Sequence, residues 1–116
     1  MINWIELNNL NSVDDIKIKS TQRVQVIFKH STRCSISSVA KNRLEKFNQI
    51  EDVDFHYLDL IKHRDVSNYV AETFQVNHES PQILAIYHSE CFYEESHYAI
   101  NMEEIISQIN LQKKGL

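Results

Sequence analysis

The chain has 116 residues, of which 42% are hydrophobic, and this suits one compact domain spanning residues 1–116. Its 16 acidic and 12 basic residues give a net charge of −4 and are scattered along the chain, so no basic stripe exists to neutralise phosphates. These numbers argue against nucleic acid and anionic membranes as partners.

No apolar run approaches the ~20 residues that a membrane span needs. Residues 1–9 lack the basic and apolar regions of a secretory signal, so we expect a cytoplasmic protein. The two cysteines, Cys34 and Cys91, are too few and too far apart for the disulfide framework of a small secreted domain. In a reducing compartment, such a cysteine either fills the core or carries chemistry.

The first part of the chain predicts a strand, a helix and a second strand. Residues 3–7 can form a short edge strand, and Ser12 followed by Asp15 has capping-box spacing for a helix. The inward face of this helix would carry Val13, Ile16 and Ile18. The β-branched and aromatic run 24–28 predicts a buried central strand that stops at 29–32.

The apolar residues of segment 34–48 recur at intervals of three and four, which predicts an amphipathic helix directly after the central strand. They are Ile36, Val39, Ala40, Leu44 and Phe47. The resulting pattern is a strand, a tight turn and a helix, with Cys34 at the point where the helix begins.

The second half of the chain continues the alternation of strands and helices. Residues 53–57 alternate as a strand, and 83–87 and 91–95 read as a hairpin that turns at 88–90. A helix between them would bury Val66, Tyr69, Val70 and Phe74. A last helix, starting at Asn101, would bury Met102, Ile105, Ile106 and Ile109. The order predicts an α/β fold, with a central mixed sheet covered by helices on both faces.

Cys34 should lie near the unpaired N–H groups and the positive dipole end of its helix. This placement favours the thiolate, which is the nucleophilic form of cysteine. Arg33 and His30 are the basic neighbours. Ser37, three residues further on, can donate a hydrogen bond to the thiolate but cannot attack a disulfide formed at Cys34. Such a disulfide would have to be resolved by a second molecule.

Three separate segments resemble those of the monothiol bacilliredoxins: 29–37 (KHSTRCSIS), 66–72 (VSNYVAE) and 78–82 (HESPQ). The likeness extends from about residue 28 to residue 97 and implies a thioredoxin-like fold. The family motif reads T-C-P-I-S, whereas here Arg33 precedes the cysteine and Ser35 replaces the proline. Ser35 restores a backbone N–H that proline lacks, and Arg33 adds positive charge near the sulfur.

The resemblance implies a role in the bacillithiol redox system of Gram-positive bacteria. Cys34 would take bacillithiol from S-bacillithiolated client proteins by thiol–disulfide exchange, with bacillithiol or another reducing thiol as co-substrate and no tightly bound cofactor. Around the catalytic Cys34, the expected thiolate-stabilising residues are Arg33, Ser35, Ser37 and His30. The expected substrate-binding residues are Thr32, Ser80, Pro81 and His78.

In thioredoxin-like folds, a cis-proline ahead of a strand faces the active-site cysteine, and the residue before it can pair with a bound chain. Pro81 is the only proline in the chain and matches this position, so we predict that the Ser80–Pro81 bond is cis and lies beside Cys34. The six histidines form no compact ligand spacing with cysteines or acidic residues, so we expect no metal site.

Two other functions stay open. One is a glutaredoxin-like monothiol protein that uses another low-molecular-weight thiol, or that holds an iron–sulfur cluster with it, although the C-G-F-S motif is absent. The other is a non-catalytic redox-sensing or adaptor module. In each case we expect Cys91 to be an ordinary strand residue, because strand length places it roughly 15–20 Å from Cys34 and a disulfide needs Cα atoms within ~7 Å.

Overall fold

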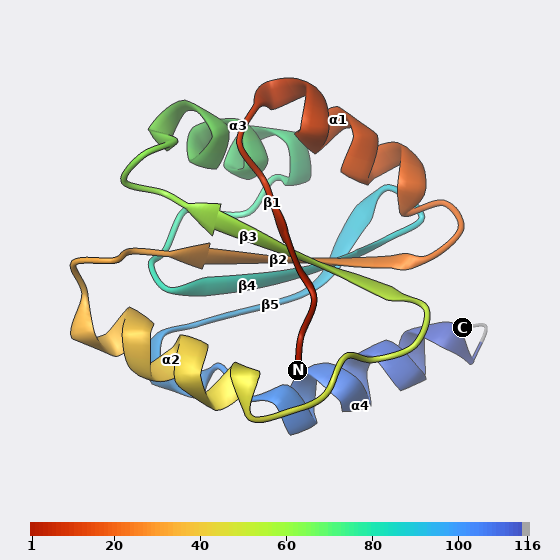
Figure 1. Cartoon of the computed structure of the whole chain (residues 1–116). Helices are drawn as coiled ribbons and strands as arrows, with labels where there is room; N and C mark the ends of the chain where they lie inside the picture. Colours follow the sequence, from red (N-terminus) through yellow and green to blue (C-terminus); the bar gives the residue numbers. More distant parts are fainter. Residues whose placement is uncertain (115–116) are drawn as a thin grey trace.

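Five strands form one mixed sheet in the computed structural model, which describes residues 1–114 (Figure 1). The strands are β1 (Trp4–Glu6), β2 (Val24–His30), β3 (Val53–Asp59), β4 (Gln82–Tyr87) and β5 (Glu90–Ser96). The helices are α1 (Leu10–Lys19), α2 (Ser35–Glu45), α3 (Arg64–Phe74) and α4 (Met102–Lys113), with a 3₁₀ helix η1 (His97–Ala99). In the order β1-β3-β2-β4-β5, the first three strands are parallel, and β4 is antiparallel to both of its neighbours.

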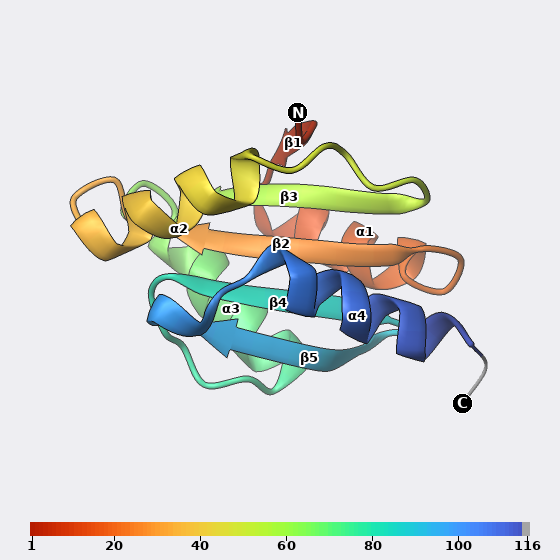
Figure 2. The same ribbon diagram turned by 90° about the horizontal axis from the view of Figure 1, so that it is seen from below.

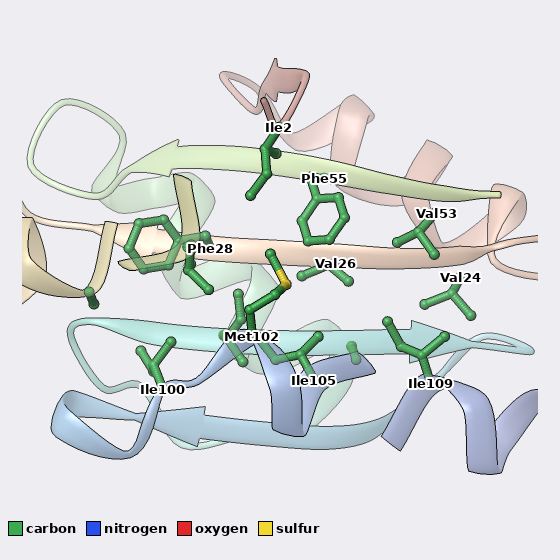
Figure 3. Packing of buried hydrophobic residues seen from close by; sticks show 14 residues of the cluster. Ile2, Val24, Val26, Phe28, Val53, Phe55, Ile100, Met102, Ile105 and Ile109 are labelled. Carbon is green, nitrogen blue, oxygen red and sulfur yellow. The ribbon is translucent and has the colours of Figure 1, made fainter. Parts of the chain in front are cut away.

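Helices α1 and α3 cover one face of the sheet, and α2 and α4 cover the other (Figures 1 and 2). Successive side chains of the central strand β2 point to opposite faces, so Val26 and Phe28 enter one core while Ile27 enters the other. Figure 3 shows the first of these cores, where β2 and β3 face Met102 and Ile105 of α4. The predicted mixed sheet with helices on both faces is confirmed.

Helix α1 begins earlier than predicted. Its N-cap is Asn9, whose side-chain oxygen accepts a hydrogen bond from the Ser12 backbone N–H at 2.8 Å, so Ser12 is not the cap. The expected inward position of Ile18 is also wrong, because 68% of its surface is exposed. Val13 and Ile16, three residues apart, are the buried residues of this helix.

Helix α2 is shorter than predicted and turned slightly differently. It ends at Glu45 rather than at 48, and Val39, expected in the core, is 42% exposed. Its buried residues are Ser37, Ala40 and Leu44. This spacing of three and four residues is typical of a helix. One of the buried residues is Ser37, however, and a pattern of apolar residues alone does not identify a serine as buried.

Strand β2 continues two residues beyond its predicted end and includes Lys29 and His30. Both residues are buried, Lys29 completely. Their polar side chains suggested the end of the strand, whereas the backbone keeps its pairing with β3 as far as His30 and Asp59. Strand β3 is correspondingly longer than predicted, and β1 is shorter, at three residues.

A buried polar network joins β2 to β3. His56 Nε2 donates to Gln25 Oε1 at 2.8 Å, and Gln25 Nε2 donates to Asp54 Oδ2 at 2.8 Å. Both Gln25 and His56 are buried, so each depends on the other for its hydrogen bonds. Burial lowers the pKa of His56 to about 4, which makes the imidazole neutral in the folded protein at ordinary pH.

This network predicts that the protein loses stability in mild acid. Between about pH 4 and 6.5 the unfolded chain protonates His56 while the folded chain does not, so unfolding takes up a proton. The free energy of unfolding should therefore fall as the pH falls through this range, by up to about 3 kcal/mol from this residue. Urea titrations at several pH values measure this free energy of unfolding. His56→Gln, which keeps an N–H donor for Gln25, should flatten the dependence, whereas His88→Asn at an exposed turn should leave it unchanged.

Candidate active site

Cys34 lies at the N-cap of α2, where the chain leaves the carboxyl end of the central strand β2. Its backbone is extended (φ −110°, ψ 120°), and its N–H donates to the Ser31 carbonyl oxygen at 3.2 Å. The Cys34 carbonyl accepts the first helical hydrogen bond, from the Ser38 N–H at 3.1 Å. Cys34 therefore takes the cap position itself, at the end of the helix where the first-turn amides are unpaired, and its side chain accepts no hydrogen bond from them in the free protein.

The Cys34 thiol is free and half-buried. Thr32, Arg33 and Ser35 are exposed around it. The first turn of α2 contains no acidic residue, so no carboxylate of this turn opposes a thiolate at the helix N-terminus. The positive end of the helix dipole therefore favours negative charge on the Cys34 sulfur, which is the sulfur that a disulfide at this edge of the protein would encounter.

Ser37 is completely buried and joins the helix to the strand. Its hydroxyl oxygen accepts a hydrogen bond from the Ser31 backbone N–H at 3.0 Å and shares another with His30 Nδ1 at 2.6 Å. When His30 donates in the second bond, the Ser37 hydroxyl hydrogen is left free for another acceptor. The predicted bond from Ser37 to the thiolate stays a prediction.

His30 is buried between the aromatic rings of Phe28 and Tyr57, whose centroids lie 5.7 and 5.6 Å from that of the imidazole. Burial lowers the pKa of His30, and the positive charge of Lys41 lowers it further. A neutral imidazole contributes through its hydrogen bond to Ser37 rather than through a full positive charge. Among the basic residues predicted to act on the thiolate, Arg33 is the one that carries a permanent charge.

The Ser80–Pro81 peptide bond is cis, as predicted. Strands β2 and β4 pair Lys29 with Gln82, so Pro81 lies level with His30 at the end of β2 from which the Cys34 turn starts. The Pro81 carbonyl accepts a hydrogen bond from the His97 N–H at 3.0 Å. Ser80 Oγ is buried and, within residues 1–114, has no hydrogen-bond partner.

Sequence reasoning missed Lys29. Its Nζ donates to the Ser67 carbonyl oxygen at 3.2 Å and lies 3.2 Å from Nδ1 of His78, which is itself exposed in the loop before Ser80. The sequence did contain a signal for its burial. Alternate residues of a strand point to the same face, so Lys29 lies on the same face as the buried Ile27.

Residues 5–105 match the family model described as monothiol bacilliredoxin BrxC. The chain belongs to the monothiol bacilliredoxin family. This confirms the resemblance inferred from the three sequence segments.

Solved structures similar to this bacilliredoxin share the thioredoxin fold. One, described as a thioredoxin-fold protein and a candidate oxidoreductase, is 28% identical, with a TM-score of 0.78 over 90% of this chain and 92% of that chain. Thioredoxin from Trypanosoma brucei brucei is 12% identical, with a TM-score of 0.72 over 97% and 92%. A thioredoxin mutant from Halobacterium salinarum is 13% identical, with a TM-score of 0.71 over 94% and 89%. The last two show the fold alone.

Cys91 is at the opposite end of the bacilliredoxin sheet. It pairs with Ile86 near the β4–β5 hairpin, five residues along β4 from Pro81, or roughly 16 Å along the strand. Its sulfur donates to the Tyr93 carbonyl oxygen at 3.3 Å, and burial raises the pKa of the Cys91 thiol to about 11. Both cysteines are free.

Among residues 1–114, no group of three or more His, Cys, Asp or Glu side chains is placed to hold a metal ion. Within the same residues, no helix is both long and apolar enough to cross a membrane.

The two cysteines should differ strongly in reactivity. At pH 7.5 an alkylating reagent should modify Cys34 at least ~100-fold faster than Cys91, because a thiol with a pKa of about 11 is almost entirely protonated. Mass spectrometry of tryptic peptides over a time course measures both rates. Urea-unfolded protein is the control, in which the two rates should converge. Comparable rates in the folded protein would contradict the assignment of Cys34 as the nucleophile.

Proposed function

We propose that this bacilliredoxin removes bacillithiol from S-bacillithiolated client proteins by thiol–disulfide exchange at Cys34. The observation that supports the proposal best is the position of Cys34 at the N-cap of an 11-residue helix, with a serine and not a second thiol three residues later. A free thiol is present at this edge of the sheet, and a second thiol that could resolve a disulfide is not part of its motif.

The first step is the attack of the Cys34 thiolate on the sulfur of bacillithiol in the mixed disulfide. The bond between the client sulfur and the bacillithiol sulfur breaks, and a bond between Cys34 Sγ and the bacillithiol sulfur forms. The client leaves as a thiolate and takes a proton from solvent. The client cysteine is reduced, and Cys34 is oxidised to a mixed disulfide.

The second step needs a thiol from outside the chain. Ser37 cannot attack the new disulfide because a hydroxyl is a far weaker nucleophile than a thiolate at neutral pH, and Ser37 is already committed to His30 and Ser31. Bacillithiol or another reducing thiolate attacks the bacillithiol sulfur, forms a new disulfide with it, and releases the Cys34 thiolate. The protein returns to its starting state.

The surrounding residues would orient the substrate and stabilise the thiolate. The first-turn amides of α2 and the charge of Arg33 favour negative charge on the Cys34 sulfur. Thr32 follows the end of β2, and Ser80 precedes the start of the neighbouring strand β4. The backbone of Ser80 would pair with the client chain that carries the disulfide. Pro81 would pack against the disulfide itself.

We predict that Cys34→Ser abolishes the release of client thiol, whereas Cys91→Ser retains it within about twofold of wild type. The reason is that Cys34 is the attacking group and Cys91 is a half-buried strand residue at the other end of the sheet. The measurement is the appearance of free client thiol from a bacillithiolated protein, with excess bacillithiol present as reductant.

The same client carrying glutathione is the control for the choice of thiol. Faster release of glutathione than of bacillithiol would contradict the proposed substrate and favour a glutaredoxin-like function. A Cys91→Ser variant that becomes trapped as a mixed disulfide at Cys34 would show that Cys91 is the resolving cysteine.

A further inference from the structure

A buried cation lies beside the loop that carries Ser80 and Pro81, and the exchange steps described above do not use it. Lys29, on the central strand, has no exposed surface. Its Nζ donates to the Ser67 carbonyl oxygen of α3 at 3.2 Å and lies 3.2 Å from His78 Nδ1. Lysine is rarely buried unless its charge is satisfied, and here one of its two partners is a histidine of the active-site loop.

We propose that Lys29 is a positioning residue that holds His78 as the neutral tautomer with its proton on Nε2, and that this N–H donates a hydrogen bond to an acceptor oxygen of the disulfide substrate. The proposal deepens the function proposed above and rests on it. The role of Lys29 is exerted through His78, since the buried lysine itself has no access to a substrate.

The tautomer follows from the two groups that face Nδ1. The Lys29 ammonium lies 3.2 Å from it and the Ser67 hydroxyl 3.3 Å. A hydroxyl can donate or accept, so Ser67 alone would tolerate a proton on either nitrogen of His78. An ammonium only donates, so Nδ1 must offer its lone pair to Lys29. The imidazole proton is therefore on Nε2.

The charges around His78 keep it neutral. Burial lowers the pKa of His78, and the positive charges of Lys29 and Arg64 lower it further, while Glu79 raises it. Glu79 is itself hydrogen-bonded to His97 at 3.0 Å. Burial lowers the pKa of Lys29 to about 8, which leaves it mainly protonated at neutral pH. His78 thus presents a neutral N–H donor.

The location of His78 suits a contact with the substrate. Its side chain is exposed, two residues before Ser80, and within residues 1–114 Nε2 has no hydrogen-bond partner. The loop is held from its other end by Gln82, whose side-chain amide donates to the Asn77 carbonyl at 3.0 Å. An acceptor oxygen at this place belongs either to a peptide group of the client or to the low-molecular-weight thiol.

Heteronuclear NMR of the imidazole nitrogens tests the positioning role without any turnover. In the wild type, His78 should be the Nε2–H tautomer with a titration midpoint below that of an ordinary histidine. In Lys29→Met the midpoint should rise, and the Nδ1–H tautomer should appear, donating to Ser67. Ser67→Ala is the matched control and should keep the wild-type tautomer. An Nδ1–H tautomer in the wild type would overturn the proposal even if Lys29→Met does not fold.

Enzyme kinetics test whether the Nε2–H group of His78 donates a hydrogen bond to the substrate. His78→Asn should raise KM for a bacillithiolated client roughly five- to tenfold with little change in kcat, the effect of one lost hydrogen bond. His78→Gln, whose amide nitrogen can take the place of Nε2, should restore most of the loss. A small bacillithiol mixed disulfide, assayed in parallel, shows which part of the substrate carries the acceptor oxygen. An equal rise in KM for this small substrate assigns the acceptor to bacillithiol. An unchanged KM assigns it to the client. Wild-type KM for both substrates in His78→Asn would overturn the donor role.

Discussion

The hydroxyl group of Ser37 joins the end of strand β2 to the first turn of helix α2. It accepts from the Ser31 N–H and is hydrogen-bonded to His30 Nδ1 at 2.6 Å, in a place from which solvent is excluded. Because a buried polar group is costly to leave unpaired, this contact fixes how the helix starts relative to the sheet. The position of Cys34, between Ser31 and Ser37, depends on it. The serine that stands in place of a second thiol also anchors the turn that carries Cys34, the proposed nucleophile.

The alternation of side chains along β2 distributes the site between two faces of the sheet. His30 points toward the core under α2 and connects with Ser37, while Lys29 points toward α3 and contacts His78. One strand end therefore supports both the helix that carries Cys34 and the loop that carries Ser80. This explains why two polar residues are buried at the end of the most central strand, where apolar side chains would pack at lower cost.

Much of this arrangement could be predicted from the sequence, because it rests on local patterns. The β-branched run of β2, the cap position of Cys34 and the place of Pro81 each have a short-range signature, and together they predicted the fold and the candidate nucleophile. The partners of Ser37 and the burial of Lys29 have no such signature. They depend on where α2 and α3 pack against the sheet, and a lysine in a sequence is normally an exposed residue. Val39 and Ile18 were misplaced because a helix of 10 or 11 residues leaves the phase of its apolar stripe uncertain by one residue.

The central claim is that Cys34 takes bacillithiol from a client and keeps it until another molecule removes it. Mass spectrometry with peptide mapping, after one equivalent of a bacillithiolated client has reacted with the reduced protein in the absence of any other thiol, tests it directly. The account predicts one bacillithiol adduct, on the peptide that contains Cys34, with Cys91 still a free thiol and the client fully reduced. A Cys34–Cys91 disulfide, or an adduct on Cys91, would contradict it.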